Sequence, residues 1–435
     1  MYDVVIVGGG TGGVASAVSY AKAGFKTAII EKQLSLGGTQ TNGLVTPFMP
    51  SQVSKSNISK IILDNYQKYD KDTEKIEFEQ AYSFNPELFQ YSLDRLMEDL
   101  GVDVYYDMIC TSAEVSDQTI VSVTAQNAFT TMKFEASLFV DASANVQLGK
   151  LAGLPLQTDD SVKQAVSLRF EIANIDLIRL KAFLVEKNYK FGNLEKPYLE
   201  FVYVPENELV IGLKPYVEQA IKDGIITSDD ARYIQGFTTP STDGLLSFNG
   251  PQLPNIYDIS NPLQYSKAIS QGRHMQQRLH KFLKLYIPGF EQSFISKSAN
   301  MLGVRESSRL LGVQTATGDD YLNRRKDTSS VAKGDWYIDI HSDDIEVESD
   351  SFKMKYNAGE YYDIPYGTLV STQADNYISI GRHISTSFEM QASTRIQYTI
   401  YMMAEELGKI YQYCQAEDVK VNDVKSIKKG YYESK

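Results

Sequence analysis

Three glycines near the start of the chain have the spacing of a phosphate-binding loop. Gly8, Gly10 and Gly13 form the pattern G-x-G-x-x-G. In such a loop the first glycine permits a tight turn, the second lets a pyrophosphate approach the backbone, and the third lets a helix pack closely on the preceding strand. The start of that helix offers unpaired N–H groups and the positive end of its dipole to the phosphates. The pattern therefore predicts a dinucleotide-binding site.

The segments around this loop are those that a dinucleotide site requires. The sequence MYDVVIVGGGTGGVASAVSYAKAGFKTAIIEK reads as strand, glycine turn, helix and strand, a complete βαβ unit in about 30 residues. Glu31 ends the second strand, where its carboxylate would accept hydrogen bonds from the adenosine ribose, and an acid there disfavours the 2′-phosphate of NADP. The alternative is a structural turn in an α/β protein that binds no nucleotide.

Two further features favour FAD over NAD. Gly37, Gly38 and Thr39 follow soon after that acid, and a second glycine pair lets the backbone come close to the extended ribityl and pyrophosphate part of FAD. A strand expected at residues 377–380, followed by Gly381, would return the C-terminal segment to the first sheet. A simple nicotinamide dehydrogenase needs no such return. The chain has no second nucleotide fingerprint, so direct reduction by NAD(P)H is not supported.

One histidine and two arginines are candidates for chemistry on a bound substrate. An acid or base commonly assists hydride transfer at a flavin, and His383 suits that role because an imidazole has an ordinary pKa of about 6.5. Alternatively, this histidine lies in a Gly-Arg-His turn and simply bonds backbone. Arg305 and Arg309 lie in V-R-E-S-S-R, and on a helix the i, i+4 spacing would place both on one face, where one could clamp a carboxylate. The alternative is an Arg–Glu network that holds two domains together.

Two more side chains complete the catalytic candidates. Tyr366, in I-P-Y, could donate a hydrogen bond to a substrate oxygen, although an aromatic residue beside proline also serves as packing. Arg395 lies in the last expected helix and could face either the flavin or a substrate carboxylate.

The elements that must position these residues are those of an α/β protein. A helix is expected after Asn85-Pro86-Glu87, because Asn caps a helix, Pro suits its first turn and Glu complements its dipole. Residues 120–124 and 131–134 alternate like an antiparallel meander, which passes into an apolar strand at 137–140. Further helices are expected at residues 58–69, 263–286 and 391–413.

The chain is long enough for two interleaved domains. Its 435 residues exceed the usual size of one domain, and its character changes after Gly153-Leu154-Pro155. We therefore predict a discontinuous, Rossmann-like FAD-binding domain, with a parallel sheet and a β-meander, over residues 1–155 and 291–435. An inserted α+β substrate or cap domain would span residues 156–290, and part of 325–362 could join it.

Composition excludes several other classes of protein. A formal net charge of −12 and a pI near 5.0 oppose binding to nucleic acid or to an anionic membrane surface. The two cysteines, Cys110 and Cys414, allow neither a disulfide framework nor a thiolate metal cluster, and the four histidines lack the spacing of a zinc motif. No apolar run reaches the roughly 18 residues of a membrane helix. We expect no metal, no signal peptide, a cytoplasmic location and a small-molecule substrate, with a homo-oligomer left open.

Over most of its length the chain resembles the FAD-dependent oxidoreductase family of glutathione-reductase-like fold. The segments that carry the resemblance are VVIVGGGTGGVASAVSYAKAG, LGGTQTNGLVTPF, FNPELFQYSLDRLMEDLGV, LFVDASANVQLGKLAG, IPGFE, LGVRESSRLLG, YDIPYGTLV and IGRHISTSFEMQASTRI. The glycine motif is shared by the whole superfamily, whereas VRES, IPY and GR-x-IS are more specific.

The resemblance implies non-covalent FAD and electron transfer at the flavin ring. It also implies that the start of the last helix, near Ala392 and Ser393, faces the isoalloxazine, where the helix dipole would stabilise negative charge on the reduced flavin. The residues that it places at FAD are Gly8, Gly10, Thr11, Gly12, Gly13, Glu31, Lys32, Gly37, Gly38, Thr39, Asp141, Ala142, Gly381, Arg382, Ala392 and Ser393.

The chain departs from the family pattern at two places. A Gly-Asp-Gly-like turn commonly follows the Asp-Ala strand end, but here the residues are Ser143-Ala144-Asn145-Val146. The family often has Cys after Gly-Arg and a His a few residues later, whereas His383 and Phe388 occupy those places. Substrate chemistry is therefore expected to differ from that of relatives.

These observations predict an FAD-dependent dehydrogenase or reductase that acts on a small polar metabolite by hydride transfer at flavin N5. An electron donor or acceptor is implied, and the sequence does not identify it. Two alternatives stay open. One is a flavoenzyme whose FAD is not redox-active, such as a hydratase or isomerase. The other is a non-catalytic protein that retains the fold.

Overall fold

The structure is a computed structural model of the whole chain. It describes residues 1–71, 78–79, 81–157, 164–187, 200–203, 213–254, 258–341 and 355–434. Residues 342–354 fall within the segment 325–362 that we considered for the inserted domain, so this part of the prediction lies outside the described residues.

The N-terminal strand lies at the centre of a seven-stranded sheet. Strand β1 (Tyr2–Val7) pairs in parallel with β2 (Thr27–Ile30) on one side and with β8 (Thr131–Asp141) on the other. The strand order is β5-β2-β1-β8-β7-β6, with β18 also paired to β8. The apolar run Val4–Val7 is buried because both faces of this parallel part are covered. The predicted α/β class with a parallel sheet is confirmed.

The predicted meander is confirmed as β6 (Ile109–Ser116), β7 (Thr119–Gln126) and the first half of β8. The meander strand and the apolar strand that we expected separately are one continuous strand. The first half of β8 alternates between exposed and buried side chains, and the second half is buried throughout. Because one strand serves both sheet regions, the meander is held rigidly beside the central strands.

The C-terminal segment returns to the first sheet, as predicted. Strand β18 (Tyr377–Ser379) pairs in parallel with the end of β8, and β5 (Asp103–Tyr105) pairs in parallel with β2. Parallel strands end at the same edge of a sheet, and ligands of open α/β sheets bind at that edge. The residues that follow β1, β2, β8 and β18, namely Gly8, Glu31, Ala142 and Ile380, are therefore brought together.

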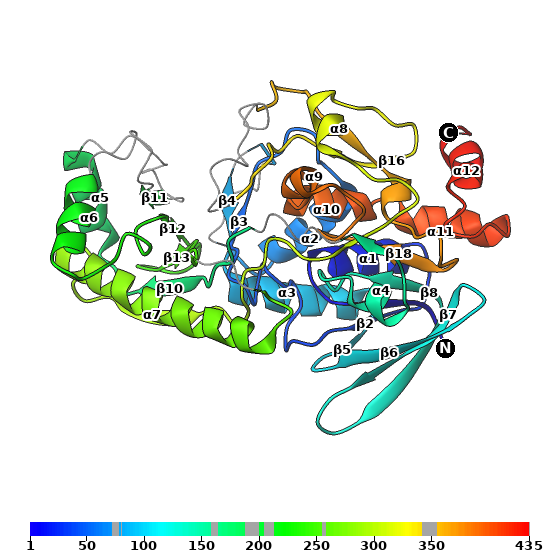
Figure 1. Ribbon diagram of the computed structural model, residues 1–435, viewed down its shortest axis with the longest axis horizontal. Coiled ribbons are helices and arrows are strands. Elements are labelled where there is room, and N and C mark those ends of the chain that lie inside the picture. Colours follow the sequence, from blue (N-terminus) through cyan, green and yellow to red (C-terminus); the bar gives the residue numbers. More distant parts are fainter. Residues whose placement is uncertain are drawn as a thin grey trace.

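Helices cover the central strands. Helix α1 (Thr11–Lys22) packs against α2 (Asn57–Gln67), α3 (Pro86–Asp99), α10 and α11 (Figure 1). The predicted cap of α3 is confirmed, since the Asn85 side chain accepts hydrogen bonds from the N–H groups of Glu87 and Leu88.

The prediction of one helix at residues 391–413 was wrong. The chain forms α9 (Phe388–Thr394), α10 (Gln397–Ala404) and α11 (Leu407–Ala416) instead. Arg395 leaves the helical path, and Ile396 has an extended backbone (φ −75°, ψ 140°) from which α10 starts. Buried side chains precede and follow this break, so the hydrophobic pattern alone did not reveal it. The break creates a new helix start beside the edge of the sheet.

A second sheet, with its own apolar core, lies to one side of the first (Figure 1). Its order is β11-β12-β13-β10-β14, and it is covered by α5, α6 and the long α7, the helix predicted at 263–286. The bounds are β10 (Phe170–Ala173), α5 (Leu177–Glu186), β11 (Glu200–Tyr203), α6 (Lys214–Lys222), β12 (Ile234–Thr238), β13 (Leu246–Phe248), α7 (Pro262–Tyr286) and β14 (Phe294–Ser298). Strand β14, which follows the predicted boundary at residue 290, pairs with β10 in this sheet.

The hairpin of β16 (Ser330–Gly334) and β17 (Tyr362–Pro365) packs on α10 and contributes to the main core, not to that of the second sheet. The described helices include none that is both long and apolar enough to cross a membrane. The remaining elements are β3 (Pro47–Phe48), β4 (Tyr82–Ser83), α4 (Gln147–Leu151), β9 (Leu156–Gln157), β15 (Arg309–Leu310), α8 (Gly318–Leu322), a 3-10 turn (Tyr366–Thr368), α12 (Val424–Ile427) and a π turn (Lys428–Tyr432).

Replacing Gly13 with alanine is expected to destabilise the fold by about 3 kcal/mol or more. A Cβ at this position would stand 1.9 Å from the Gly8 carbonyl oxygen, a backbone atom that cannot move aside. Urea unfolding measures the change. The control is Gly24→Ala, where φ is +89° but no atom lies within 4 Å of the added carbon, so only a backbone cost of about 1–2 kcal/mol is expected. Equal stability of the two variants would contradict the packing argument.

Candidate functional site

A cavity of about 400 Å³ opens at the carboxyl edge of the first sheet and reaches the second sheet. This volume is within the usual range for small-molecule sites, about 300–1,000 Å³. The predicted cofactor residues that line it are Gly8, Gly10, Thr11, Gly12, Glu31, Lys32, Gly38, Thr39, Ala142, Gly381 and Arg382. The predicted residues outside the lining are Gly13, Gly37, Asp141, Ala392 and Ser393.

The glycines of the loop fall into two groups. Gly8 has φ +101°, and a Cβ there would lie 2.6 Å from the Ala142 carbonyl oxygen. At Gly8 and Gly13 the protein's own backbone leaves no room for a side chain. Gly10 is different, because an added Cβ would meet only the Gly38 Cα, at 3.8 Å, and its φ of −74° suits any residue. The space above Gly10 belongs to the cavity. We call this open stretch of backbone the cradle at Gly10, and it fits a group that must approach the backbone closely.

Glu31 is fixed at the end of β2 with its carboxylate toward the cavity. Oε2 accepts a hydrogen bond from the Gly9 N–H at 2.6 Å, and Oε1 accepts one from the Gln33 N–H at 2.7 Å. The side chain is only 5% exposed. A carboxylate held by two backbone N–H groups keeps lone pairs available for hydroxyl donors, so this end of the cavity fits a ribose.

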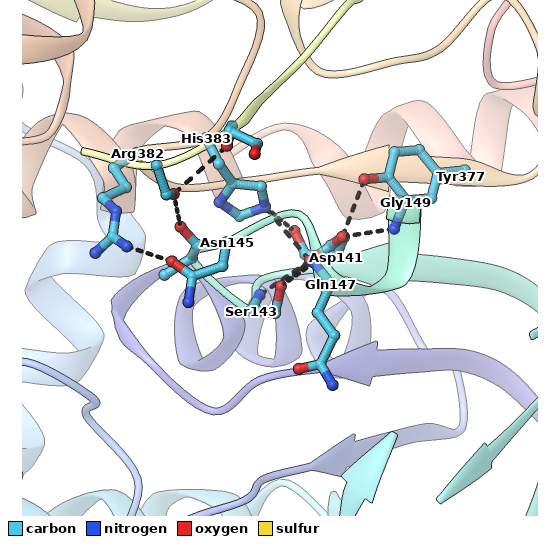
Figure 2. A network of polar contacts seen from close by, with 11 residues as sticks. Asp141, Ser143, Asn145, Gln147, Gly149, Tyr377, Arg382 and His383 are labelled. Carbon is cyan, nitrogen blue, oxygen red and sulfur yellow. Dashed lines mark hydrogen bonds and ion pairs between the residues drawn. The ribbon is translucent and has the colours of Figure 1, made fainter. Parts of the chain in front are cut away.

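Asp141, at the end of β8, is the centre of a buried polar network (Figure 2). One carboxylate oxygen accepts hydrogen bonds from the N–H and hydroxyl of Ser143, and the other from the Gly149 N–H and the Tyr377 hydroxyl. Burial alone would raise the pKa of Asp141, but His383 and these donors outweigh burial and hold the pKa below its ordinary value. The ionised carboxylate therefore joins the ends of β8 and β18.

His383 lies in this network and does not line the cavity. Its Nε2 is 3.1 Å from the Asp141 carbonyl oxygen and 3.4 Å from Oδ1, and the side chain is fully buried. Its Nδ1 has no hydrogen-bond partner among the described residues. The geometry thus favours the alternative that we gave for His383, which is a bond to backbone. It does not favour contact between His383 and a substrate.

The turn that departs from the family pattern positions an arginine. Ala144 and Val146 adopt left-handed conformations, with φ of 66° and 52°. This conformation presents Asn145, whose side-chain oxygen accepts a hydrogen bond from Nη2 of Arg382 at 2.5 Å (Figure 2). The unusual residues therefore hold Arg382 at the cavity wall.

The helix whose N-terminus faces the cavity is α10. We had expected this N-terminus near Ala392 and Ser393. Ile396 and Gln397, at the start of α10, line the cavity. Ala392 and Ser393 are buried inside α9, and the Ser393 hydroxyl donates to the Trp336 carbonyl oxygen. The break between the two helices is the physical reason for this correction.

Four arginines line the cavity, namely Arg169, Arg305, Arg382 and Arg395. The charge of Arg395 acts on both Arg305 and Arg382, and we call the part of the cavity at these three arginines its inner end. Burial and, after it, the charge of Arg395 lower the pKa of Arg305 and of Arg382 to about 10. Burial also lowers the pKa of Arg395, against the effect of Asp339. Guanidinium groups stay protonated at neutral pH, so Arg395 repels both Arg305 and Arg382.

Asp339 and His341 also line the cavity, and the sequence analysis missed both. His341 Nε2 is 3.2 Å from Asp339 Oδ1, and its Nδ1 is 3.2 Å from the side-chain nitrogen of Gln252. An amide nitrogen only donates, so Nδ1 accepts and the proton sits on Nε2. The alternating sequence W-Y-I-D-I-H, with polar groups at every second residue, was a signal that could have found the pair.

Charges around the pair act in opposite directions. Burial lowers the pKa of His341, and Arg305 and Arg395 lower it further, against the effect of Asp339. For Asp339, burial alone would raise the pKa, but His341 and the two arginines hold it far below its ordinary value. The pair is therefore a neutral imidazole beside a carboxylate at neutral pH.

Two predicted residues lie elsewhere. Tyr366 is fully buried, and its hydroxyl donates to the Val421 carbonyl oxygen. Arg309 begins strand β15 and donates to the Thr386 carbonyl oxygen, so the expected helix through V-R-E-S-S-R was wrong. Of the two arginines in that motif, only Arg305 lines the cavity.

Among protein families, the one described as FAD dependent oxidoreductase matches nearly the whole chain, over residues 3–431. Dihydrolipoyl dehydrogenase of Trypanosoma brucei brucei is 56% identical over 41 residues, 9% of each chain. Soluble pyridine nucleotide transhydrogenase of Vibrio vulnificus (strain YJ016) is 39% identical over 62 residues, 14% of this chain and 12% of the other. These two matches span about a tenth of the relatives' length.

Two solved structures share the fold. The p-nitrophenol 4-monooxygenase from Pseudomonas putida DLL-E4 has a TM-score of 0.53 at 11% identity, over 100% of this chain and 84% of the other. A geranylgeranyl bacteriochlorophyll reductase-like protein from Thermoplasma acidophilum has a TM-score of 0.51 at 13% identity, over 100% and 83%. At such identities the likeness shows the fold alone.

Replacing Gly10 with alanine is expected to leave the fold intact and to weaken FAD binding. The added Cβ makes only ordinary contact with the protein, so the free energy of unfolding of the apoprotein should change by less than about 1 kcal/mol. The methyl group would stand where a pyrophosphate approaches, so the Kd for FAD should rise about tenfold or more. Urea unfolding and calorimetric titration of the apoprotein measure the two effects. An unchanged Kd would show that FAD does not pass over Gly10.

Proposed function

Because this chain belongs to the family of FAD-dependent oxidoreductases and FAD is its cofactor, we propose that it transfers a hydride between a small polar substrate and non-covalently bound FAD. The observation that carries the proposal is one continuous cavity. It runs from Glu31 over Gly10 to the arginines and the Asp339–His341 pair. One end suits the dinucleotide, and the other offers charged groups for a substrate.

The residues at the first end fit FAD. Glu31 would accept hydrogen bonds from the ribose hydroxyls, and the first turn of α1, at Thr11 and Gly12, would donate backbone N–H groups to the pyrophosphate. The start of α10, at Ile396 and Gln397, would face the isoalloxazine with the positive end of its helix dipole. When bound, FAD supplies two-electron redox chemistry at its ring.

His341 is the proposed acid–base group, in preference to His383. It lines the cavity, and its lowered pKa keeps the imidazole neutral and able to accept a proton at neutral pH. Its Nδ1 carries the lone pair, and the substrate's hydroxyl or amine would take the place of the Gln252 amide there. Asp339 accepts the Nε2 hydrogen bond and would stabilise the imidazolium that forms.

The absorbance spectrum of the purified protein tests the proposal directly. Flavin bands near about 450 nm that heat denaturation releases into solution are expected for non-covalent FAD. Anaerobic addition of small amines, hydroxy acids and sugars should then bleach the bands with at least one compound. If dithionite bleaches the flavin bands but no compound in a broad panel does, the result would favour a non-redox role of FAD. A colourless protein that FAD does not stabilise would contradict the proposal altogether.

Activity in the oxidation direction is expected to fall at acidic pH. The neutral imidazole of His341 is the active form and its pKa lies below 6.5, so kcat/KM should fall as the pH drops through that pKa. His341→Gln should lower kcat/KM about 10²–10⁴-fold and remove the acidic limb. His280→Gln is the matched control, because His280 also has a lowered pKa but lies in helix α7 and bonds Ser293, and it does not line the cavity. An acidic limb that persists in His341→Gln but vanishes in His383→Gln would assign the role to His383.

A further inference from the structure

The inner end of the cavity carries more positive charge than its own acids neutralise. Arg305, Arg382 and Arg395 line it, and the acids whose charges act on these three arginines are Asp339 and Glu306. Glu306 also accepts a hydrogen bond at Oε2 from the Gln164 N–H. An excess of buried guanidinium groups around a cavity is costly unless an anion completes it.

Two of these arginines line the cavity and keep N–H groups without an acceptor among the described residues. Arg305 donates from Nη1 to the Ala165 carbonyl oxygen at 2.5 Å, which is its one acceptor within the described parts of the chain. Arg395 donates from Nη2 to the Asp339 carbonyl oxygen at 2.6 Å, and the same nitrogen lies 3.7 Å from the carboxylate oxygen Oδ2 of Asp339. Its Nη1 is buried and has no acceptor among the described residues. In both arginines a backbone carbonyl holds one side of the guanidinium, and other N–H groups have no hydrogen-bond acceptor among the described residues.

Taking the proposed function as its basis, we propose that the substrate is a carboxylic acid whose carboxylate is bound by Arg305 and Arg395. A guanidinium of fixed plane matches the two oxygens of a carboxylate in bidentate geometry. The two side chains come from different segments, Arg305 from the stretch before β15 and Arg395 from the junction of α9 and α10. A carboxylate between them would therefore be held beside the start of α10 and near the Asp339–His341 pair.

The surrounding wall favours an organic acid over a free inorganic anion. Ile259, Tyr265 and Leu302 line the same cavity and contribute apolar surface. Apolar side chains give no binding energy to phosphate, but they stabilise the carbon skeleton of an acid. The same arginines could otherwise bind a phosphate group, so the test includes both anions.

The test uses the FAD-loaded protein and begins with its flavin content and its bleaching by dithionite. Acetate, succinate and benzoate are then titrated, each beside its neutral amide, and inorganic phosphate is titrated separately. The readout is the change in the flavin absorbance spectrum, which gives a Kd without turnover. We expect at least one acid to bind about tenfold or more tightly than its amide, and more tightly than phosphate.

Substitutions separate the proposed site from nonspecific charge. Arg305→Gln and Arg395→Gln should each weaken binding of that acid about 10–100-fold, and Arg305→Lys and Arg395→Lys should restore part of it while retaining FAD. Arg95→Gln is the matched control, because Arg95 is an exposed arginine of α3 paired with Glu98; it should leave the Kd unchanged.

The outcomes distinguish this inference from the proposed function. Protein without FAD would refute the proposed function and with it the carboxylate site. Two results with FAD bound and reducible would overturn the carboxylate site alone. In one, no acid binds better than its amide. In the other, the Arg305 and Arg395 variants bind the acid as tightly as wild type. Tighter binding of phosphate than of every acid would overturn it as well and identify a phosphate site.

Discussion

The close contact between the first turn of α1 and the end of β1 decides where the rest of the site lies. Gly13 packs so tightly on Gly8 that a single carbon added there would overlap the Gly8 carbonyl oxygen. This contact directs the start of α1 at the carboxyl edge of the sheet, beside Ala142 after β8 and Ile380 after β18. Gly10, only two residues from Gly8, is free of such contact and faces the cavity. The same short loop therefore combines tight backbone packing at Gly8 and Gly13 with open space at Gly10.

A second constraint carries this geometry to the C-terminal segment. Asp141 accepts hydrogen bonds from its own turn, from α4 and from Tyr377 of β18, and His383 lies against it. The network brings Arg382 to the cavity wall, where Asn145 holds it. The turn that departs from the family pattern thus retains a structural purpose, and its altered residues are no argument against a functional site.

Short-range signals in the sequence predicted the framework well. The glycine spacing, Glu31 and the cap at Asn85 are local features, and the structure has the strands and helices that they indicate. The break at Arg395–Ile396 could not be predicted, because tertiary packing and not hydrophobic period ends α9 there. The predicted helix at V-R-E-S-S-R failed for a similar reason, since Arg309 pairs with a distant strand, β9. The convergence of Arg305, Arg395 and the Asp339–His341 pair depends on long-range contacts that one sequence does not contain.

The most direct test of the account is a crystal structure of the protein with FAD bound. We predict that the ribose lies at Glu31, that the pyrophosphate lies over Gly10 at the start of α1, and that the isoalloxazine lies beside Ile396 and Gln397 with the arginines and His341 beyond it. FAD in the reverse direction, or outside this cavity, would contradict the account, because the cradle at Gly10 and the basic inner end would then need another explanation.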